Sequence, residues 1–158
     1  MSELLLRNRQ RLQPLNLPLL RQFTEAAIAD ILGGTAYELG FHFVGPQEMA
    51  RVNGQFLQHT GSTDVITFDH RESADQTPHG EIFICVADAM KQAREFRTEW
   101  QGELARYVIH GLLHLAGYDD LAPAARRVMK RAENRHLRRL ARRFPLSRLR
   151  RTPKLPAR

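Results

Sequence analysis

Two histidines and an aspartate, His110, His114 and Asp120, are the residues of this sequence whose types and spacing most clearly suggest chemistry. Histidines four residues apart lie one turn apart on the same face of a helix, so both imidazoles can bind one metal ion. Gly117 favours the end of such a helix because glycine tolerates a left-handed backbone, and the chain can then bring Asp120 back to the same ion. Two imidazoles and one carboxylate leave a coordination position open, which favours a catalytic metal site over a structural one.

The helix predicted over residues 101–115 separates these histidines from its apolar face. Aliphatic side chains recur along that face at helical spacing: Leu104, Val108, Ile109, Leu112, Leu113 and Leu115. His110 and His114 occupy the remaining arc, so we expect them to face a cleft or the surface. Glu103 lies on the same arc two turns earlier, where a carboxylate could orient a metal-binding imidazole.

The residues alone leave alternatives to this metal site open. A histidine pair at this spacing is also compatible with two surface side chains, or with side chains that are hydrogen-bonded in the core. Cys85 could be a fourth ligand, although its apolar surroundings are typical of a small core residue. A zinc metalloprotease is disfavoured because it carries a glutamate base directly after its first histidine, where this chain has Gly111.

The hydrophobic pattern predicts an α+β fold in which helices cover a small mixed β-sheet, with the metal site on a helix and the following turn. Apolar residues at helical spacing indicate the helices, and β-branched or alternating apolar residues indicate the strands. The predicted strands span residues 4–12, 37–44, 63–69 and 81–86, and the predicted helices span residues 18–32, 46–57, 88–96, 101–115 and 123–143.

Length and composition are typical of a single globular domain. The chain has 158 residues, of which 42% are hydrophobic and 26% are charged. We predict one domain over residues 1–143 and a basic, proline-containing, disordered tail over residues 144–158. No apolar run approaches the roughly 20 residues of a membrane span, and the start lacks the apolar core of a signal peptide. Cys85 is the only cysteine, so no disulfide forms within the chain, and a cytoplasmic location is expected.

Charge is distributed unevenly along the chain, whose net charge is +7. Residues 126–158 hold 14 of the 24 Lys and Arg residues and one acid, Glu133, whereas residues 1–125 hold the other 10 basic residues and 16 acids. This asymmetry favours a polyanionic partner, and nucleic acid more than a membrane surface. A solvated helix with a disordered tail would have the same composition. No Trp or Tyr interleaves with the basic run, so we expect it to bind phosphates rather than to stack on bases.

The segment His110-Gly-Leu-Leu-His-Leu-Ala-Gly-Tyr-Asp119 extends the motif well beyond its two histidines. It resembles the hallmark His-Gly-x-Leu-His-Leu-x-Gly-Tyr-Asp-His of the YbeY family of bacterial rRNA-maturation endoribonucleases. Asn53 followed by Thr63-Asp-Val-Ile-Thr-Phe68 resembles the Asn…Thr-Asp-Val-Leu-Ser-Phe segment of that family. Gly80-Glu-Ile82 resembles its Gly-Asp-Ile strand start. The motifs occur in the family's order over residues 35–140.

This resemblance implies a small sheet covered by helices, one zinc ion per chain and a single-strand-specific endoribonuclease. It implies a role in 16S rRNA 3′-end maturation and ribosome quality control. The implied partners are rRNA and the small ribosomal subunit, with no membrane and no small-molecule cofactor. By position, the metal ligands of the family fall on His110, His114 and Asp120. Imidazole and carboxylate ligands would also suit nickel, manganese or iron.

Two departures from the family pattern concern the site. Asp120 stands where the hallmark has a histidine. A carboxylate can still bind zinc, but it makes the metal a weaker Lewis acid, and Asp119 could compete for the role. Phe56-Leu57 stands where the family has Tyr-Arg, so an arginine expected to contact phosphate is missing.

The sequence offers two candidate catalytic residues, and no general base can be named. His59 could replace the missing arginine as a phosphate contact or proton donor. Arg106, one turn before His110, could offset the charge of a developing oxyanion. The departures also leave open a second function, a non-catalytic RNA- or ribosome-binding factor with a structural zinc.

Overall fold

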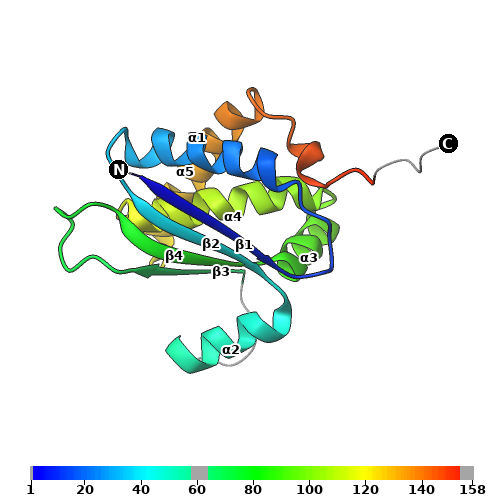
Figure 1. Ribbon diagram of the computed structural model, residues 1–158. Coiled ribbons are helices and arrows are strands. Elements are labelled where there is room, and N and C mark those ends of the chain that lie inside the picture. The colour runs from blue at the N-terminus through cyan, green and yellow to red at the C-terminus, as the bar shows by residue number, and fades with distance from the viewer. Residues whose placement is uncertain (1, 58–63, 154–158) are drawn as a thin grey trace.

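The computed structural model describes residues 2–57 and 64–153, and it is built on a four-stranded mixed sheet (Figure 1). The strand order is β1-β2-β4-β3, in which β1, β2 and β4 are parallel and β3 is antiparallel to β4. The elements are β1 (Glu3–Arg9), α1 (Leu17–Leu32), β2 (Glu38–Val44), α2 (Pro46–Leu57), β3 (Val65–Asp69), β4 (His79–Cys85), α3 (Val86–Phe96), α4 (Trp100–Leu115), α5 (Pro123–Ala141) and the 3-10 helix η1 (Leu146–Leu149). The predicted α+β class and mixed sheet are confirmed.

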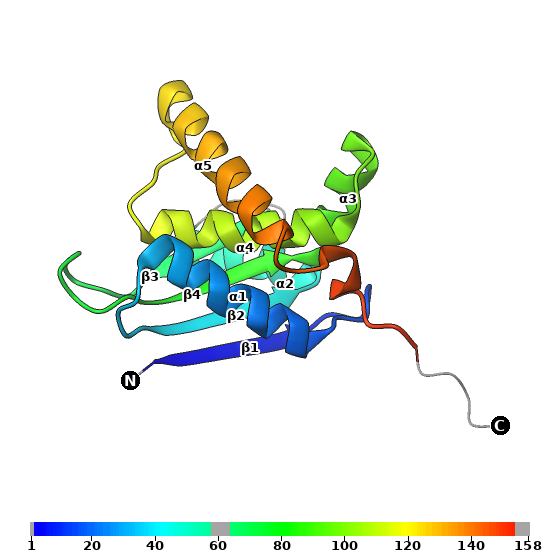
Figure 2. The same ribbon diagram turned by 90° about the horizontal axis from the view of Figure 1, so that it is seen from above.

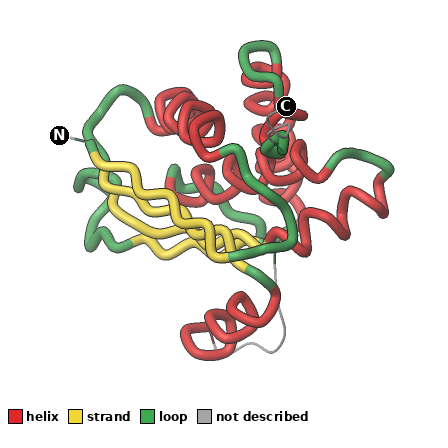
Figure 3. The backbone as a smooth tube through the Cα atoms, turned by 45° about the vertical axis from the view of Figure 1, so that its right-hand side comes forward, coloured by secondary structure: helices red, strands yellow, loops and turns green. Residues whose placement is uncertain are grey.

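The helices cover the two faces of the sheet unequally. Helices α1 and α4 pack on one face, and α2 lies on the other (Figures 1 and 3). The larger core lies between the sheet and α1 and α4, where Phe23, Phe41 and Leu112 are fully buried. A smaller apolar cluster under α2 includes Val44 and Met49. No helix in the described part of the chain is both long and apolar enough to cross a membrane.

Helix α4 packs on the sheet with no room for a side chain at Gly111. A Cβ atom added to Gly111 would lie 2.7 Å from Cγ2 of Ile82, a buried side chain of β4. The position after the first histidine therefore faces the sheet rather than the histidine side of α4. A glutamate there would collide with Ile82 in this packing, so the metalloprotease arrangement does not fit this helix.

We expect Gly111→Ala to be destabilising relative to Gly102→Ala, a substitution in the same helix. Gly102 has no atom within 4 Å of an added Cβ, so its replacement should stabilise α4 by up to about 1 kcal/mol through helix propensity. Gly111→Ala gives the same gain in helix propensity, but its Cβ crowds Ile82. The free energy of unfolding of Gly111→Ala should therefore be about 1–3 kcal/mol lower than that of Gly102→Ala. Urea denaturation measures the difference, and equal stability of the two variants would contradict this packing.

Helix α5 is held against α1 by ionic hydrogen bonds. Nδ1 of His136 lies 2.6 Å from Oδ2 of Asp30, and Nη1 of Arg139 donates to Oδ1 of Asp30 at 2.8 Å. Burial disfavours the charged carboxylate, yet these two hydrogen bonds hold the pKa of Asp30 below its ordinary value. The contacts fix the position of α5, which also packs on α4.

Residues 144–151 are ordered, contrary to the prediction that a disordered tail begins at residue 144. Leu149 in η1 is 1% exposed and belongs to the main core, and the ring of Phe144 packs edge-on against Phe23 at 5.9 Å between centroids. The backbone N–H of Arg151 donates to the carbonyl of Pro14 at 2.8 Å. The segment folds because a few apolar residues reach a core that the rest of the chain supplies. Residues 154–158 lie outside the described residues.

Candidate metal centre

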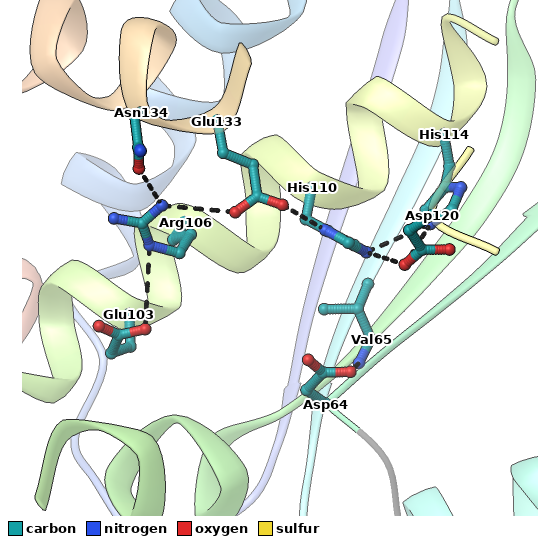
Figure 4. A network of polar contacts seen from close by, with 9 residues as sticks. All are labelled: Asp64, Val65, Glu103, Arg106, His110, His114, Asp120, Glu133 and Asn134. Carbon is teal, nitrogen blue, oxygen red and sulfur yellow. Dashed lines mark hydrogen bonds and ion pairs between the residues drawn. The ribbon is translucent and has the colours of Figure 1, made fainter. Parts of the chain in front are cut away.

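The structure brings the three predicted ligands together at the end of α4 (Figure 4). The Nε2 atoms of His110 and His114 lie 3.2 Å apart. Oδ2 of Asp120 lies 3.5 Å from Nε2 of His110 and 3.6 Å from Nε2 of His114. Both histidines are partly exposed, while the aliphatic residues of α4 that were predicted to face the core are buried. The helix therefore points its two imidazoles away from the core, as the sequence predicts.

The spacing of these three atoms fits a tetrahedral metal ion. Zinc lies about 2.0–2.2 Å from nitrogen and carboxylate oxygen ligands, which places two tetrahedral ligands roughly 3.3–3.5 Å apart. The three observed separations span 3.2–3.6 Å and form the triangular base of such a tetrahedron. Two neutral imidazoles and one carboxylate are also an ordinary zinc donor set. The residues present therefore fit a zinc ion, with the fourth position left for water or substrate.

The turn after α4 places the third ligand. Gly117 has φ of +100°, and the N–H groups of Gly117 and Tyr118 donate to the carbonyls of His114 and Leu113. This is the Schellman arrangement, in which a glycine ends the helix and reverses the chain. The carboxylate of Asp119 then accepts a hydrogen bond from the N–H of Leu121 at 2.8 Å. Asp119 is engaged in the turn, so Asp120 and not Asp119 joins the histidines.

A buried glutamate of α5 orients the first histidine. Oε2 of Glu133 lies 2.6 Å from Nδ1 of His110, and Glu133 is only 6% exposed. A carboxylate accepts hydrogen bonds, so Nδ1 is the protonated nitrogen and Nε2 of the neutral ring points its lone pair into the site. Burial raises the pKa of Glu133, but the hydrogen bond and charge of His110 outweigh it and leave the pKa below its ordinary value.

The electrostatics of His110 depend on the same contact. Burial disfavours the imidazolium, yet the hydrogen bond to Glu133 and the nearby carboxylates raise the pKa of His110 above its ordinary value. These carboxylates give the site a negative potential, which attracts cations to the position between the two histidines.

Glu133 has the role that the sequence predicts for Glu103, which is to orient a metal-binding imidazole. Glu103 accepts a hydrogen bond from Thr98 and lies 4.0 Å from Nε of Arg106. Arg106 in turn donates through Nη1 to Asn134 at 2.7 Å and to Glu133 at 3.4 Å (Figure 4). Arg106 thus supports the glutamate that orients His110. Its role as a direct contact to substrate stays a prediction.

A cleft of about 850 Å³ opens beside His110 and Asp120. This volume lies within the usual range of ligand sites, about 300–1,000 Å³. Carboxylates gather near the metal ligands, where Asp64 and Glu133 line the wall. The α5 wall of the same cleft carries three exposed cations, Arg126, Arg127 and Lys130. The cleft can therefore hold an anion along its α5 wall, while a metal ion at His110 and Asp120 would offset the carboxylates beside it.

The remaining sequence candidates lie elsewhere. His59 lies outside the described residues, and so do the side chains of Phe56 and Leu57. Cys85 is fully buried at the end of β4, and burial raises the pKa of its thiol to about 11. Among the described residues the potential ligand group contains only His110, His114 and Asp120, so Cys85 is a core residue rather than a fourth ligand.

Comparison of the sequence with known proteins relates this chain to one family. A sequence model of the family described as "Endoribonuclease YbeY" matches residues 7–141. A protein of that name from Parabacteroides distasonis is 37% identical over 111 residues, which cover 70% of this chain and 77% of the relative. Another from Chlorobium luteolum is 38% identical over 110 residues, which cover 70% of this chain and 79% of the relative.

A solved structure shares the fold. The solution structure of TM1509 from Thermotoga maritima has a TM-score of 0.65 to this chain at 24% sequence identity. The alignment covers 99% of this chain and 100% of that one. At this level of identity the likeness shows that the two chains share a fold, and it carries no information about the site.

Proposed function

The chain belongs to the YbeY endoribonuclease family, and from this membership we propose that it is a metal-dependent endoribonuclease. The observation that carries the proposal is the triangle of His110, His114 and Asp120, of which His110 and Asp120 line a cleft whose α5 wall is basic. A metal site with an open position beside a polyanion-binding surface suits hydrolysis of a phosphodiester bond.

The proposal extends to the substrate and its setting. We propose that the ion is zinc, that unpaired RNA is the substrate, and that the protein acts in the cytoplasm on the 3′ end of 16S rRNA. Ribosome quality control and contact with the small ribosomal subunit are part of the same proposal. The relatives carry the name endoribonuclease, which supports RNA as the substrate class.

The proposed chemistry divides between the metal and the side chains of this chain. A zinc ion held by the three ligands would supply Lewis acidity toward a phosphoryl oxygen and would make water more acidic near neutral pH. Glu133 holds His110 in one orientation and keeps the proton on its Nδ1 atom. Arg106 holds Glu133, and His59 remains the proposed phosphate contact or proton donor.

The basic C-terminal part of the chain, residues 126–158, would supply most of the affinity for RNA. Among the described residues, every Lys and Arg side chain of α5 and of residues 142–153 is exposed: Arg126, Arg127, Lys130, Arg131, Arg135, Arg138, Arg139, Arg142, Arg143, Arg148, Arg150 and Arg151. Such side chains bind phosphates through counterion release, so the affinity falls steeply with salt and carries no sequence preference. This set offsets the acidic remainder of the chain, which would otherwise repel a polyanion.

Removal of the metal by a chelator tests the proposal directly. We expect chelated protein to lose cleavage of an unpaired RNA and to stay folded, because α4 is anchored by its opposite, apolar face and not by the ligands. Added Zn²⁺ should restore cleavage, and parallel additions of Mn²⁺ and Ni²⁺ would rank the metals. Cleavage assays and circular dichroism give the two readouts.

Two other results of this experiment would contradict the proposal. Unfolding on chelation would indicate a structural zinc and favour the non-catalytic RNA-binding factor. Cleavage that survives complete removal of the metal would exclude a metal-dependent reaction.

A further inference from the structure

Phe96, the last residue of α3, is an aromatic side chain that the core does not use. Its exposed fraction is 67%, and it is the one aromatic among the exposed large apolar residues whose side chains the structure describes. The helix ends at this point because Arg97 adopts a left-handed backbone, with φ of 54°, and Thr98 donates to the carbonyl of Ala93. Phe96 is therefore held at a defined helix end.

Phe96 lines the same cleft as His110 and Asp120, two of the three proposed metal ligands. Helices α3 and α5 rise from the same side of α4 and diverge (Figure 2), and the cleft lies between them. Phe96 stands on the α3 wall, Arg126, Arg127 and Lys130 stand on the α5 wall, and His110 of α4 lines the cleft as well. An apolar ring and a row of cations thus border one space that leads to the candidate metal site.

A second cavity beside His114 has a different character. It has a volume of about 670 Å³ and is lined by three carboxylates, Asp69, Glu72 and Asp75. Its one cation, Arg71, is bound to Asp69 through two hydrogen bonds. This cavity would repel phosphates, so an RNA chain that reaches the metal ligands is expected to lie on the side of Phe96.

We propose that Phe96 is a stacking platform for an unpaired RNA base, while the cations of α5 bind the adjacent phosphates. This inference rests on the proposed function and gives it a physical basis for preferring single strands. An unpaired base exposes its face to a ring, whereas a base inside a duplex is already stacked on its neighbours. The sequence predicts binding without stacking because the basic run has no Trp or Tyr, but the fold brings an aromatic from another element.

The test compares base stacking with phosphate binding in the full-length zinc-loaded protein. Binding of an unpaired RNA oligonucleotide is measured by fluorescence anisotropy over a range of salt concentrations. Phe96→Ala is expected to weaken binding by about fivefold to a hundredfold, the range for losing one base–aromatic contact. Phe96→Tyr should bind as the wild type does. The salt slope should not change in Phe96→Ala, whereas Arg127→Ala should reduce it by about 0.7.

Inorganic polyphosphate, an anionic chain without bases, is the second probe. Phe96→Ala should bind polyphosphate with wild-type affinity, and Arg127→Ala should bind it more weakly. RNA affinity of Phe96→Ala equal to the wild type would overturn the stacking assignment, and so would an equal loss on RNA and polyphosphate.

The thermal unfolding of Phe96→Ala should be unchanged because the side chain is exposed. A wild-type protein that does not cleave unpaired RNA would defeat the proposed function, whereas normal cleavage with unaltered binding in Phe96→Ala would defeat the stacking alone.

Discussion

Replacement of His114 by alanine is expected to remove the bound metal and to reduce RNA cleavage to the level of chelated wild-type protein. His114 provides one of three ligand atoms in a triangle with sides of 3.2–3.6 Å, and no other His, Cys, Asp or Glu of the described residues completes that group. The loss should exceed the roughly 10- to 100-fold effect of removing an outer contact to a metal ligand. Metal analysis of the purified protein and a cleavage assay measure the two effects.

The fold should tolerate this change, which makes the result interpretable. The side chain of His114 is 30% exposed and lies off the buried face of α4. His79→Ala is a matched control, because it removes an exposed histidine of β4 that lies outside the ligand group. The control should keep wild-type metal content and activity. A zinc-free His114→Ala protein that still cleaves RNA would contradict the metal mechanism.

The features that could be predicted from the sequence are those with local causes. The arc occupied by His110 and His114 follows from the periodicity of α4, and the return of the chain at Gly117 follows from glycine's tolerance of a left-handed backbone. The order of strands and helices was predictable for the same reason, since each element carries its own hydrophobic period. The family motifs point to the same third ligand, Asp120, that the turn after Gly117 already suggests.

The features that could not be predicted depend on contacts between distant elements. Glu133 lies 23 residues from His110 in sequence, and the two meet only because α5 crosses α4. One signal was available, since Glu133 is the single acid within residues 126–158. The buried position of Leu149 has the same kind of cause, because the segment has too few apolar residues to fold alone and relies on a core made by α1 and α4.

Loss of the Glu133 carboxylate is expected to have the largest effect among residues that do not touch the metal. Glu133→Ala should lower zinc affinity and activity by about 10- to 100-fold, because His110 would lose the acceptor that fixes its ring and its Nδ1 proton. Glu133→Gln should have a smaller effect, because the amide oxygen can still accept the hydrogen bond but carries no charge. Competition with a chromophoric zinc chelator measures the affinities.

Glu103→Gln is the control that distinguishes two effects on zinc affinity: the orientation of His110 by a hydrogen bond and the negative charge of the cleft. Glu103 lines the same cleft and lies near the same arginine, Arg106, but its carboxylate is engaged by Thr98 rather than by His110. Its replacement changes the charge of the cleft as much as Glu133→Gln does. If both variants lost zinc affinity equally, the negative potential alone would explain the effect. A selective loss in the Glu133 variants would instead show that the hydrogen bond from α5 prepares His110 to bind the metal.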